Sequence, residues 1–363
     1  MRDRADRQGD MTGMDRRAFV AAACAMGLWL AAGSSVARAH AQQPPRTRPG
    51  RDSTDPAPSE PAPVPPGYFA WAALSDRVLF APGDGGNALL LLAPRGGACA
   101  LVDAKMPYTA TTLRREAEQR GGTIETVINT HHHLDHIGGN LAFSADTRIV
   151  AHANAKPRVA PQLERLRQFL KSGVRTVSNS DGINKEQALK DAEALAAAAD
   201  TIAAERWAPT QTFSGRIGSA NLGAMPIDLH QVGAGHTDND VIVHAPQLDV
   251  VHMGDLLFHN LYPFIDRDSG ARVRDWIKTL KYAKRLCKPK TIVVPGHGDV
   301  TDVKGIDGMI EYFETSMDFV QKQIRQKKPR EEVVAMTVPG QESRGFEHLR
   351  ERAMGAMYDE LMG

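Results

Sequence analysis

Short apolar runs separated by turn-forming residues dominate the chain from about residue 75 onward. Runs of Val, Ile, Leu and Ala that are bounded by Gly, Asp, Asn or Pro are typical of buried β-strands. Such runs lie at residues 78–80, 88–92, 99–102, 126–129, 148–151, 226–229, 241–243, 250–252 and 291–294. The segment Asp84-Gly85-Gly86-Asn87 predicts a turn between the first two of these strands.

Apolar residues recur at helical spacing between and after these runs. The predicted helices span residues 109–120, 273–287, 305–327 and 345–361. Residues 155–206 also have a helical pattern and contain neither His nor Cys. We interpret this stretch as a helical insertion that either shapes and covers the mouth of a site or serves only as scaffold. Strand-rich halves flanked by helices predict a layered α/β sandwich.

The first 41 residues have the pattern of an export signal. Asp15-Arg16-Arg17 precedes a mildly apolar segment that runs through Val36, and Ala37-Arg38-Ala39 and Ala39-His40-Ala41 both fit a small-residue cleavage site. The paired arginines followed by Phe19 resemble a twin-arginine signal, with Asp15 where a Ser is usual. An uncleaved membrane anchor is the alternative, because the segment approaches the roughly 20 residues needed to span a bilayer.

Residues 42–67 are rich in proline and cannot pack a core, so they are expected to form an extended linker. The folded domain is therefore predicted to span residues 68–363. The protein is expected to be periplasmic or secreted, with the twin-arginine export machinery as a partner. No stable membrane association is expected once the signal is cleaved.

Composition narrows the function further. The chain has 363 residues, of which 42% are hydrophobic and 24% charged, and its net charge is +1. This near-neutral balance argues against nucleic acid or an anionic membrane surface as a partner. Three cysteines, Cys24, Cys99 and Cys287, are too few for a disulfide framework. We expect Cys99 and Cys287 to be reduced and buried.

The candidate chemistry begins where the strand at 126–129 ends. Four histidines and an aspartate lie between His131 and His136, and such polarity is costly to bury without a partner. Alternate side chains of an extended segment share a face, so His131 and His133 can hold one ion. Asp135 and His136 follow the start of a turn and can face a second ion. Nitrogen and carboxylate ligands suit zinc or a related transition metal; a solvated His-rich loop is the alternative.

The His-x-His-x-Asp-His pattern after a strand resembles the signature of the metallo-β-lactamase superfamily. Three further segments resemble the rest of that family's pattern in order: Gly235-His236-Thr237, Met253-Gly254-Asp255 and Pro295-Gly296-His297-Gly298. The resemblance covers roughly residues 75 to 300 and implies a four-layer αβ/βα sandwich. It also implies two metal sites, with the first metal held by His131, His133 and His236, the second by Asp135, His136 and His297, and Asp255 bridging both.

The resemblance implies a hydrolase with two zinc ions per chain, with iron or manganese as alternative metals. In this mechanism a metal-bound hydroxide attacks a carbonyl carbon, and Asp135 orients it and passes a proton to the leaving group. The expected substrate is a small ester, lactone, thioester or amide, with β-lactams as further candidates. An iron-dependent oxygenase of the same fold and a metal-retaining binding protein without turnover are the alternatives. The substrate's identity and the oligomeric state stay open.

Several neighbouring residues have expected supporting roles. The resemblance suggests that Asp103 supports the metal-binding loop, whereas its position after a strand also suits a turn former. His132 is expected to face away from the first metal. Phe264 is expected to supply an apolar wall of the pocket. His252 and His259 flank the Asp255 motif and contact either the substrate or the protein interior and surface.

Overall fold

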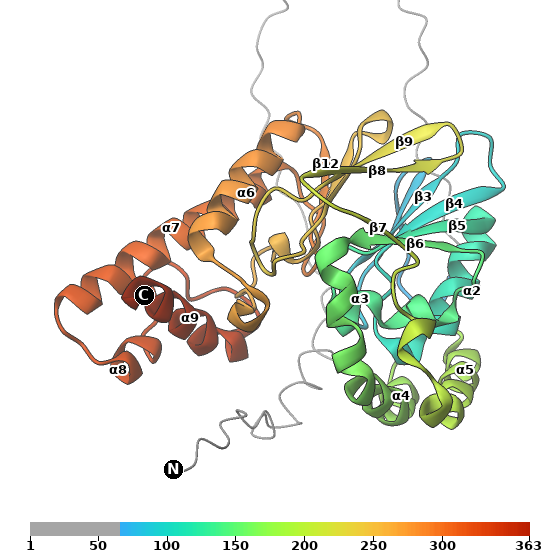
Figure 1. Cartoon of the computed structure of the whole chain (residues 1–363), viewed down its shortest axis with the longest axis horizontal. Coiled ribbons are helices and arrows are strands. Elements are labelled where there is room, and N and C mark those ends of the chain that lie inside the picture. Colours follow the sequence, from blue (N-terminus) through green and yellow to red (C-terminus); the bar gives the residue numbers. More distant parts are fainter. Residues whose placement is uncertain (1–65) are drawn as a thin grey trace, which may run out of the picture. The chain divides into compact units, whose positions relative to one another are not determined.

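Two β-sheets lie at the centre of the fold (Figure 1). The computed structural model describes residues 66–363. The predicted signal segment and nearly all of the predicted linker lie outside the described residues. Within the described part of the chain, no helix is both long enough and apolar enough to cross a bilayer.

The first sheet contains seven strands in sequence order, antiparallel from β1 to β4 and parallel from β4 to β7. They are β1 (Ala72–Ser75), β2 (Val78–Ala81), β3 (Ala88–Leu92), β4 (Ala98–Val102), β5 (Thr123–Ile128), β6 (Arg148–His152) and β7 (Gln211–Phe213). Strand β3 is apolar on both faces: Leu89 and Leu91 pack toward the second sheet, whereas Leu90 packs toward the helices. Such two-sided burial explains the continuous apolar runs in the sequence.

The second sheet contains five strands in the order β12-β11-β10-β9-β8. They are β8 (Ile217–Leu222), β9 (Met225–His230), β10 (Ile242–Ala245), β11 (Val250–His252) and β12 (Ile292–Val294). Strands β11 and β12 pair in parallel, so the loops that follow them leave the same edge of the sheet. Apolar side chains from both sheets, including Ile128, Leu229 and Val243, form the core between them.

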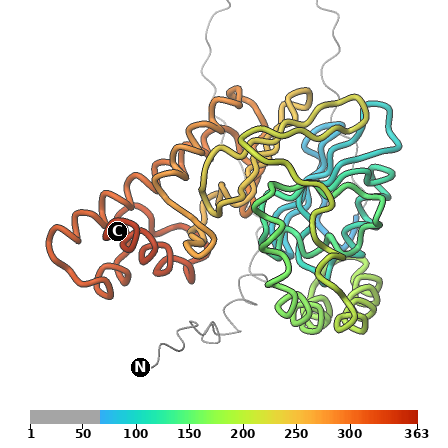
Figure 2. Tube along the Cα trace, in the orientation of Figure 1, coloured from blue at the N-terminus to red at the C-terminus, as the bar shows by residue number. Residues whose placement is uncertain are grey.

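Helices cover the outer face of each sheet. The first sheet packs against α2 (Ala110–Gly121), α4 (Leu163–Ser178) and α5 (Lys185–Ala198). The second packs against α6 (Val273–Leu286) and α7 (Val303–Arg325), and α9 (Arg350–Met362) packs against α7 with the short α8 (Arg330–Val334) beside it. The chain builds the first sheet and its helices before it enters the second half (Figure 2). This arrangement confirms the predicted four-layer sandwich.

Most of the predicted elements are present within a few residues of their expected bounds, and the predicted insertion contains helices α4 and α5. The sequence analysis did not predict β1, β7, β8 or α8. The last helix begins at Arg350 rather than at residue 345, after a 3₁₀ turn at Glu347–Leu349. Both Cys99 and Cys287 are free thiols, but only Cys99 is buried. The expectation for Cys287 was wrong because it lies at the end of α6, where the helix leaves the core.

Candidate metal centre

Four loops bring the seven predicted ligands together, and each loop follows a strand. His131, His133, Asp135 and His136 follow β5, where His133 precedes the one-turn helix α3 (Leu134–Ile137). His236 follows β9, Asp255 follows β11 and His297 follows β12. The side chains form two groups, and within each group the candidate ligand atoms lie within 4.8 Å of one another.

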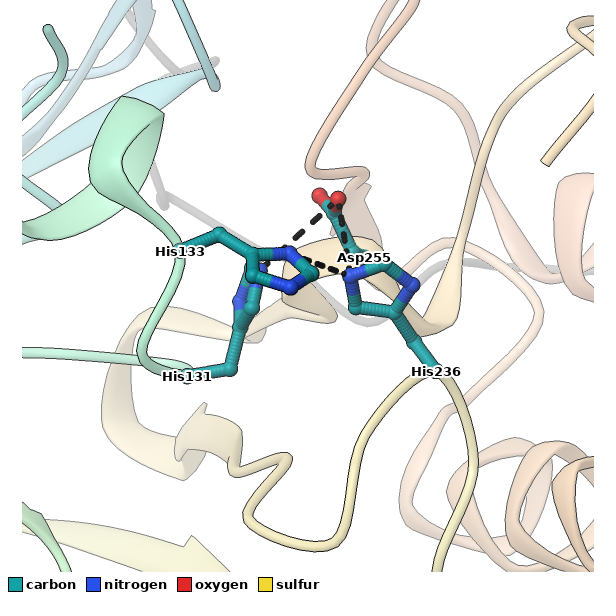
Figure 3. A group of neighbouring side chains, drawn as sticks. All are labelled: His131, His133, His236 and Asp255. Atoms are coloured by element: carbon teal, nitrogen blue, oxygen red, sulfur yellow. Dashed lines mark hydrogen bonds and ion pairs between the residues drawn. The ribbon is translucent and has the colours of Figure 1, made fainter. Parts of the chain in front are cut away.

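The first group contains His131, His133, His236 and Asp255 (Figure 3). His236 Nε2 lies 2.9 Å from His133 Nδ1 and 3.4 Å from Asp255 Oδ2. His131 Nε2 lies 3.8 Å from the same carboxylate oxygen. Three imidazoles and one carboxylate oxygen thus point to one spot.

The second group contains Asp135, His136 and His297, and the other oxygen of Asp255 faces it. Asp255 Oδ1 lies 3.0 Å from His136 Nε2 and 3.4 Å from His297 Nε2. His297 Nε2 also lies 3.2 Å from Asp135 Oδ2. Because Asp255 presents a different oxygen to each group, it stands where a bridging ligand would stand.

Three ligand atoms at this centre are buried and have no hydrogen-bond partner: His131 Nε2, His136 Nε2 and Asp255 Oδ1. A buried polar atom without a hydrogen bond costs about 1–3 kcal/mol. His136 Nε2 and Asp255 Oδ1 lie 3.0 Å apart as an ion-pair contact when His136 is protonated, and a bound ion would give all three atoms a partner. Their donor set, imidazole nitrogen with carboxylate oxygen, fits zinc or a neighbouring transition metal.

Ligation requires neutral imidazole and ionised carboxylate; His131, His236 and Asp255 approach that state without an ion, whereas His136 and His297 do not. Burial lowers the pKa of His236 to about 4, and burial with the nearby His136 lowers that of His131. Burial raises the pKa of Asp255, but the surrounding histidines outweigh it and hold that pKa well below its usual value. Burial lowers the pKa of His297, but Asp255 and Asp135 raise it to about 9. Burial likewise lowers the pKa of His136, but Asp255, Asp135 and Asp103 raise it well above its usual value. His136 and His297 would therefore each release a proton on binding an ion.

Asp103 supports the loop that carries the histidines, which confirms the role that the resemblance suggested. Its Oδ2 lies 2.7 Å from His136 Nδ1, and its Oδ1 accepts a hydrogen bond from the Thr130 backbone N–H at 2.8 Å. The carboxylate is fully buried. It therefore fixes the orientation of the His136 ring, as partners of metal-binding histidines commonly do.

The loop after Asp255 orients two histidines of the first group. Asp266 Oδ2 lies 2.8 Å from His133 Nε2, and His236 Nδ1 donates to the Phe264 carbonyl at 2.7 Å. Sequence reasoning placed this loop at the pocket but gave Asp266 no role. The only local signal was that Asp266 follows the Asp255 motif closely. The Phe264 ring centroid lies 5.7 Å from that of His133 and 5.9 Å from that of His236, as expected for a wall residue.

The other histidines of these loops have structural partners. His132 faces away from the first group, as predicted: its Nδ1 accepts from Asn239 Nδ2 at 3.0 Å, and its Nε2 lies 3.3 Å from Ser269 Oγ. His252 is fully buried, and its Nδ1 accepts from the Gly254 N–H at 3.0 Å. His259 Nδ1 donates to the Asp299 carbonyl at 2.7 Å. These contacts favour interior and surface roles for His252 and His259.

A turn after β2 packs directly against the second group. The Gly86 N–H donates to the Asp135 carbonyl at 2.9 Å, and a Cβ on Gly86 would overlap the His136 ring. The buried ammonium of Lys105 donates to the carbonyls of Ala81, Gly83 and Gly86 at 2.8, 2.7 and 3.1 Å. Sequence reasoning gave Lys105 no role. Lys105 fixes this turn, and the turn packs against the His136 ring and holds it in position.

A third His/Asp group lies away from this centre. Asp228, His230 and His244 share one face of β9 and β10, and their candidate ligand atoms lie within 4.8 Å of one another. His230 Nδ1 is 3.0 Å from the Tyr282 hydroxyl on α6. None of these residues was predicted as a ligand, and the group matters for any count of bound ions.

Comparison with known proteins gives one family. The model described as the metallo-β-lactamase superfamily matches residues 81–297, which is more than half of the chain. A segment of 81 residues is 33% identical to the metallo-β-lactamase type 2 of Bacteroides fragilis, covering 22% of this chain and 32% of that protein. A segment of 51 residues is 47% identical to the hydroxyacylglutathione hydrolase of Rhodospirillum rubrum, covering 14% and 19%. The chain thus spans a third or less of these two relatives.

A third relative matches a longer part of the chain at lower sequence identity. The chain is 26% identical over 241 residues to the probable metallo-hydrolase YqjP of Bacillus subtilis, which covers 62% of this chain and 71% of that protein. Among solved structures, the sec-alkylsulfatase Pisa1 from Pseudomonas sp. superposes with a TM-score of 0.56 at 14% identity. That match covers 81% of this chain and 50% of the sulfatase, and it shows a shared fold.

Proposed function

The chain belongs to the metallo-β-lactamase superfamily, and on that premise we propose that it is a dinuclear zinc hydrolase. Its substrate would be a small ester, lactone, thioester or amide. The observation that carries the proposal is the set of buried, unpartnered ligand atoms around Asp255, whose two oxygens face two separate groups of histidines. A single ion would leave part of this set without a partner.

In this proposal His131, His133 and His236 hold the first ion, and Asp135, His136 and His297 hold the second. Asp255 contacts both. Two bound zinc ions would supply a water of lowered pKa and polarise the carbonyl of the substrate. Iron or manganese could occupy the same donors, because imidazole and carboxylate bind all three metals.

The protein's own contribution to the reaction centres on Asp135. Its side chain is 31% exposed, whereas the side chains of His131, His136 and His236 are at most 1% exposed. Burial raises the pKa of Asp135, but His136 and His297 outweigh this and lower it below the usual range. An ionised carboxylate at the open side of the centre can orient a water and then carry its proton to the leaving group.

The choice of substrate class rests on the relatives. Proteins named hydroxyacylglutathione hydrolase and metallo-β-lactamase both match segments of this chain, and both names denote cleavage of an acyl compound by water. Neither match covers enough of the relative to carry its substrate over. We therefore propose only the reaction that both names share, which is hydrolysis at an acyl carbon.

The test combines metal analysis with a substrate panel. The purified protein should contain two zinc ions per chain and hydrolyse at least one of an aryl ester, a lactone, a thioester and a β-lactam. Turnover should vanish in Asp135→Ala and persist in Asp146→Ala, an exposed aspartate without hydrogen bonds. Ion counts are repeated in His244→Ala, because the third His/Asp group can take up an extra ion.

Each alternative has its own signature in the same experiment. Iron without zinc, together with oxygen consumption, would favour the oxygenase. Full metal loading without turnover of any substrate would favour a metal-retaining binding protein. Loss of activity in Asp146→Ala as strongly as in Asp135→Ala would remove the assigned role of Asp135.

We also propose that the protein is exported and acts in the periplasm or outside the cell. The support is the pattern of paired arginines, apolar segment and small residues within residues 1–41. We expect a small-molecule substrate and the export machinery as partners, and no nucleic acid. Fractionation of cells that express the full chain should find it in the periplasm or medium, and Arg16→Lys with Arg17→Lys should retain it inside.

A further inference from the structure

The open side of the metal centre can be located from the exposure of its ligands. The side chains of His133, Asp135 and His297 are 17%, 31% and 14% exposed. His131, His136 and His236 are shielded from solvent. A substrate must therefore approach past His133 of the first group and past Asp135 and His297 of the second, and Asp135 is the most exposed of the three.

Two phenylalanines border these two ends. The Phe264 ring centroid lies 5.7 Å from that of His133, and the Phe346 ring centroid lies 5.7 Å from that of His297. The segment that carries Phe346 is fixed to the loop after β11: the Tyr262 N–H donates to the Gly345 carbonyl at 2.9 Å, and the Gly345 N–H donates to the Asn260 carbonyl at 3.0 Å. The C-terminal part of the chain thus lies beside the open side of the centre.

This C-terminal part also supplies a positive charge. The guanidinium carbon of Arg352, in the first turn of α9, lies 4.1 Å from the centroid of the Phe264 ring. Arg352 is exposed and has neither a hydrogen bond nor an ion pair with any described residue. Asp266, the acidic residue whose charge acts most strongly on Arg352, already uses Oδ2 for His133 and Oδ1 for the Ser269 N–H. All five N–H donors of the guanidinium therefore remain free for a ligand.

We infer that Arg352 and Phe264 form a subsite for the anionic group of an acyl substrate whose reacting carbonyl lies at the metal centre. Stacking on the ring holds the planar guanidinium in place and lowers the entropy lost when it binds an anion. The Phe264 ring touches both His133 and Arg352, so one small molecule can reach the centre and the cation together. This inference rests on the proposed function and adds a charge preference to it.

Charges of both signs act on Arg352, but the structure gives it no ion pair with any described residue. Burial and the nearby Arg165 lower the pKa of Arg352, whereas Asp266 and Asp268 raise it. A guanidinium stays protonated at neutral pH in every protein setting. Arg165 likewise has no ion pair among residues 66–363 and stacks on Phe169 at 5.5 Å. The two guanidinium groups therefore act on one another while neither has an ion pair, and an incoming carboxylate that paired with Arg352 would offset this repulsion against the opposing charges of Asp266 and Asp268.

The test compares two esters that share a leaving group. One is 4-nitrophenyl acetate, which is neutral, and the other is 4-nitrophenyl hydrogen glutarate, which carries a carboxylate at the far end of its acyl chain. In Arg352→Met, which keeps an unbranched side chain of similar length over Phe264, kcat/KM for the glutarate ester should fall about tenfold or more, mainly through KM. The acetate should change less than twofold. Arg352→Lys should recover part of the loss.

The matched control is Arg285→Met. Arg285 also stacks on an aromatic ring, with its guanidinium carbon 5.1 Å from the Tyr282 centroid, but it lies on α6 beside the third His/Asp group. Both esters should react unchanged in that variant. Equal losses for the two esters in Arg352→Met, or no loss for the glutarate ester, would overturn the inference while leaving the hydrolase proposal intact.

If neither ester is hydrolysed, that result counts against the proposed hydrolase activity. The Arg352 subsite can then still be tested by measuring ligand binding. Calorimetric titration of the metal-loaded protein with glutarate should give a Kd that rises about tenfold in Arg352→Met and not in Arg285→Met. An unchanged Kd in Arg352→Met would refute the subsite. Equal thermal midpoints and equal metal content in the variants would show that the fold and the centre are preserved.

Discussion

Replacing Gly86 by Ala should disable the second group of candidate ligands although none of them is itself substituted. A Cβ built on Gly86 lies 2.6 Å from His136 Nδ1 and closer still to the other ring atoms on that edge, whereas ordinary contacts begin near 3.4 Å. Neither side can easily move. His136 is fully buried and held by Asp103, while Gly86 is held by the Asp135 carbonyl and by Lys105.

The magnitude follows from that double constraint. Overpacking a rigid interior costs about 1–3 kcal/mol and occasionally more, and here the overlap exceeds half an ångström on several ring atoms. Rotating His136 away would relieve the overlap but would break its 2.7 Å contact with Asp103. Because partners that orient a ligand are worth about 10–100-fold in metal affinity, the second ion should bind at least that much more weakly.

The assay is urea unfolding of metal-free protein together with zinc titration. Gly308→Ala is the control, because that glycine lies inside α7 and a Cβ there would meet no atom within 4 Å. The control should gain up to about 1 kcal/mol from the higher helix propensity of Ala. A Gly86→Ala protein that matches the wild type in stability and still binds two zinc ions with unchanged affinity would refute the reasoning.

Three further predictions use other contacts. Asp266→Asn should weaken zinc binding about 10–100-fold by removing the charge that holds His133, whereas the exposed Asp268→Asn should leave zinc titration unchanged. Burial lowers the pKa of Lys105 from 10.5 to about 7, so the unfolded chain binds more protons between these values. The free energy of unfolding should therefore rise with pH across that window, and this slope should be absent from Lys105→Met; equal slopes would contradict it. Removing metal with a chelator should lower the calorimetric melting temperature, because binding at a thousandfold excess over Kd stabilises by roughly 4 kcal/mol per site; an unchanged midpoint would argue against ligation.

The strands that the sequence did not reveal share one property: β1, β7 and β8 lie at the edges of their sheets. An edge strand is exposed on one side, so it lacks the continuous apolar run that marks a central strand. In β8, the residues Gly218, Ser219 and Asn221 are poor strand formers, and the burial pattern alternates. Pairing with β9 overrides that weak local preference.

The candidate ligands could be proposed from the sequence because they lie in short motifs with a recognisable spacing, whereas the residues that support them could not. Asp266 lies 133 positions from His133 in the chain, and nothing in its own neighbourhood distinguishes it from an aspartate that begins a turn. Lysine is usually a surface residue, and Lys105 is buried because its ammonium donates hydrogen bonds to three backbone carbonyls. Both roles arise from tertiary contacts that no periodicity encodes.

The seven side chains of the centre are divided between the two sheets, four after β5 and three after the strands of the second sheet. A peptide cut between Phe213 and Ile217, an exposed stretch that joins the two halves, would leave four donors on one fragment and three on the other. Neither fragment could retain a complete coordination shell by itself. Mixing the two fragments should restore activity only when zinc is present, because each ion would then be bound by side chains from both fragments and would hold them together.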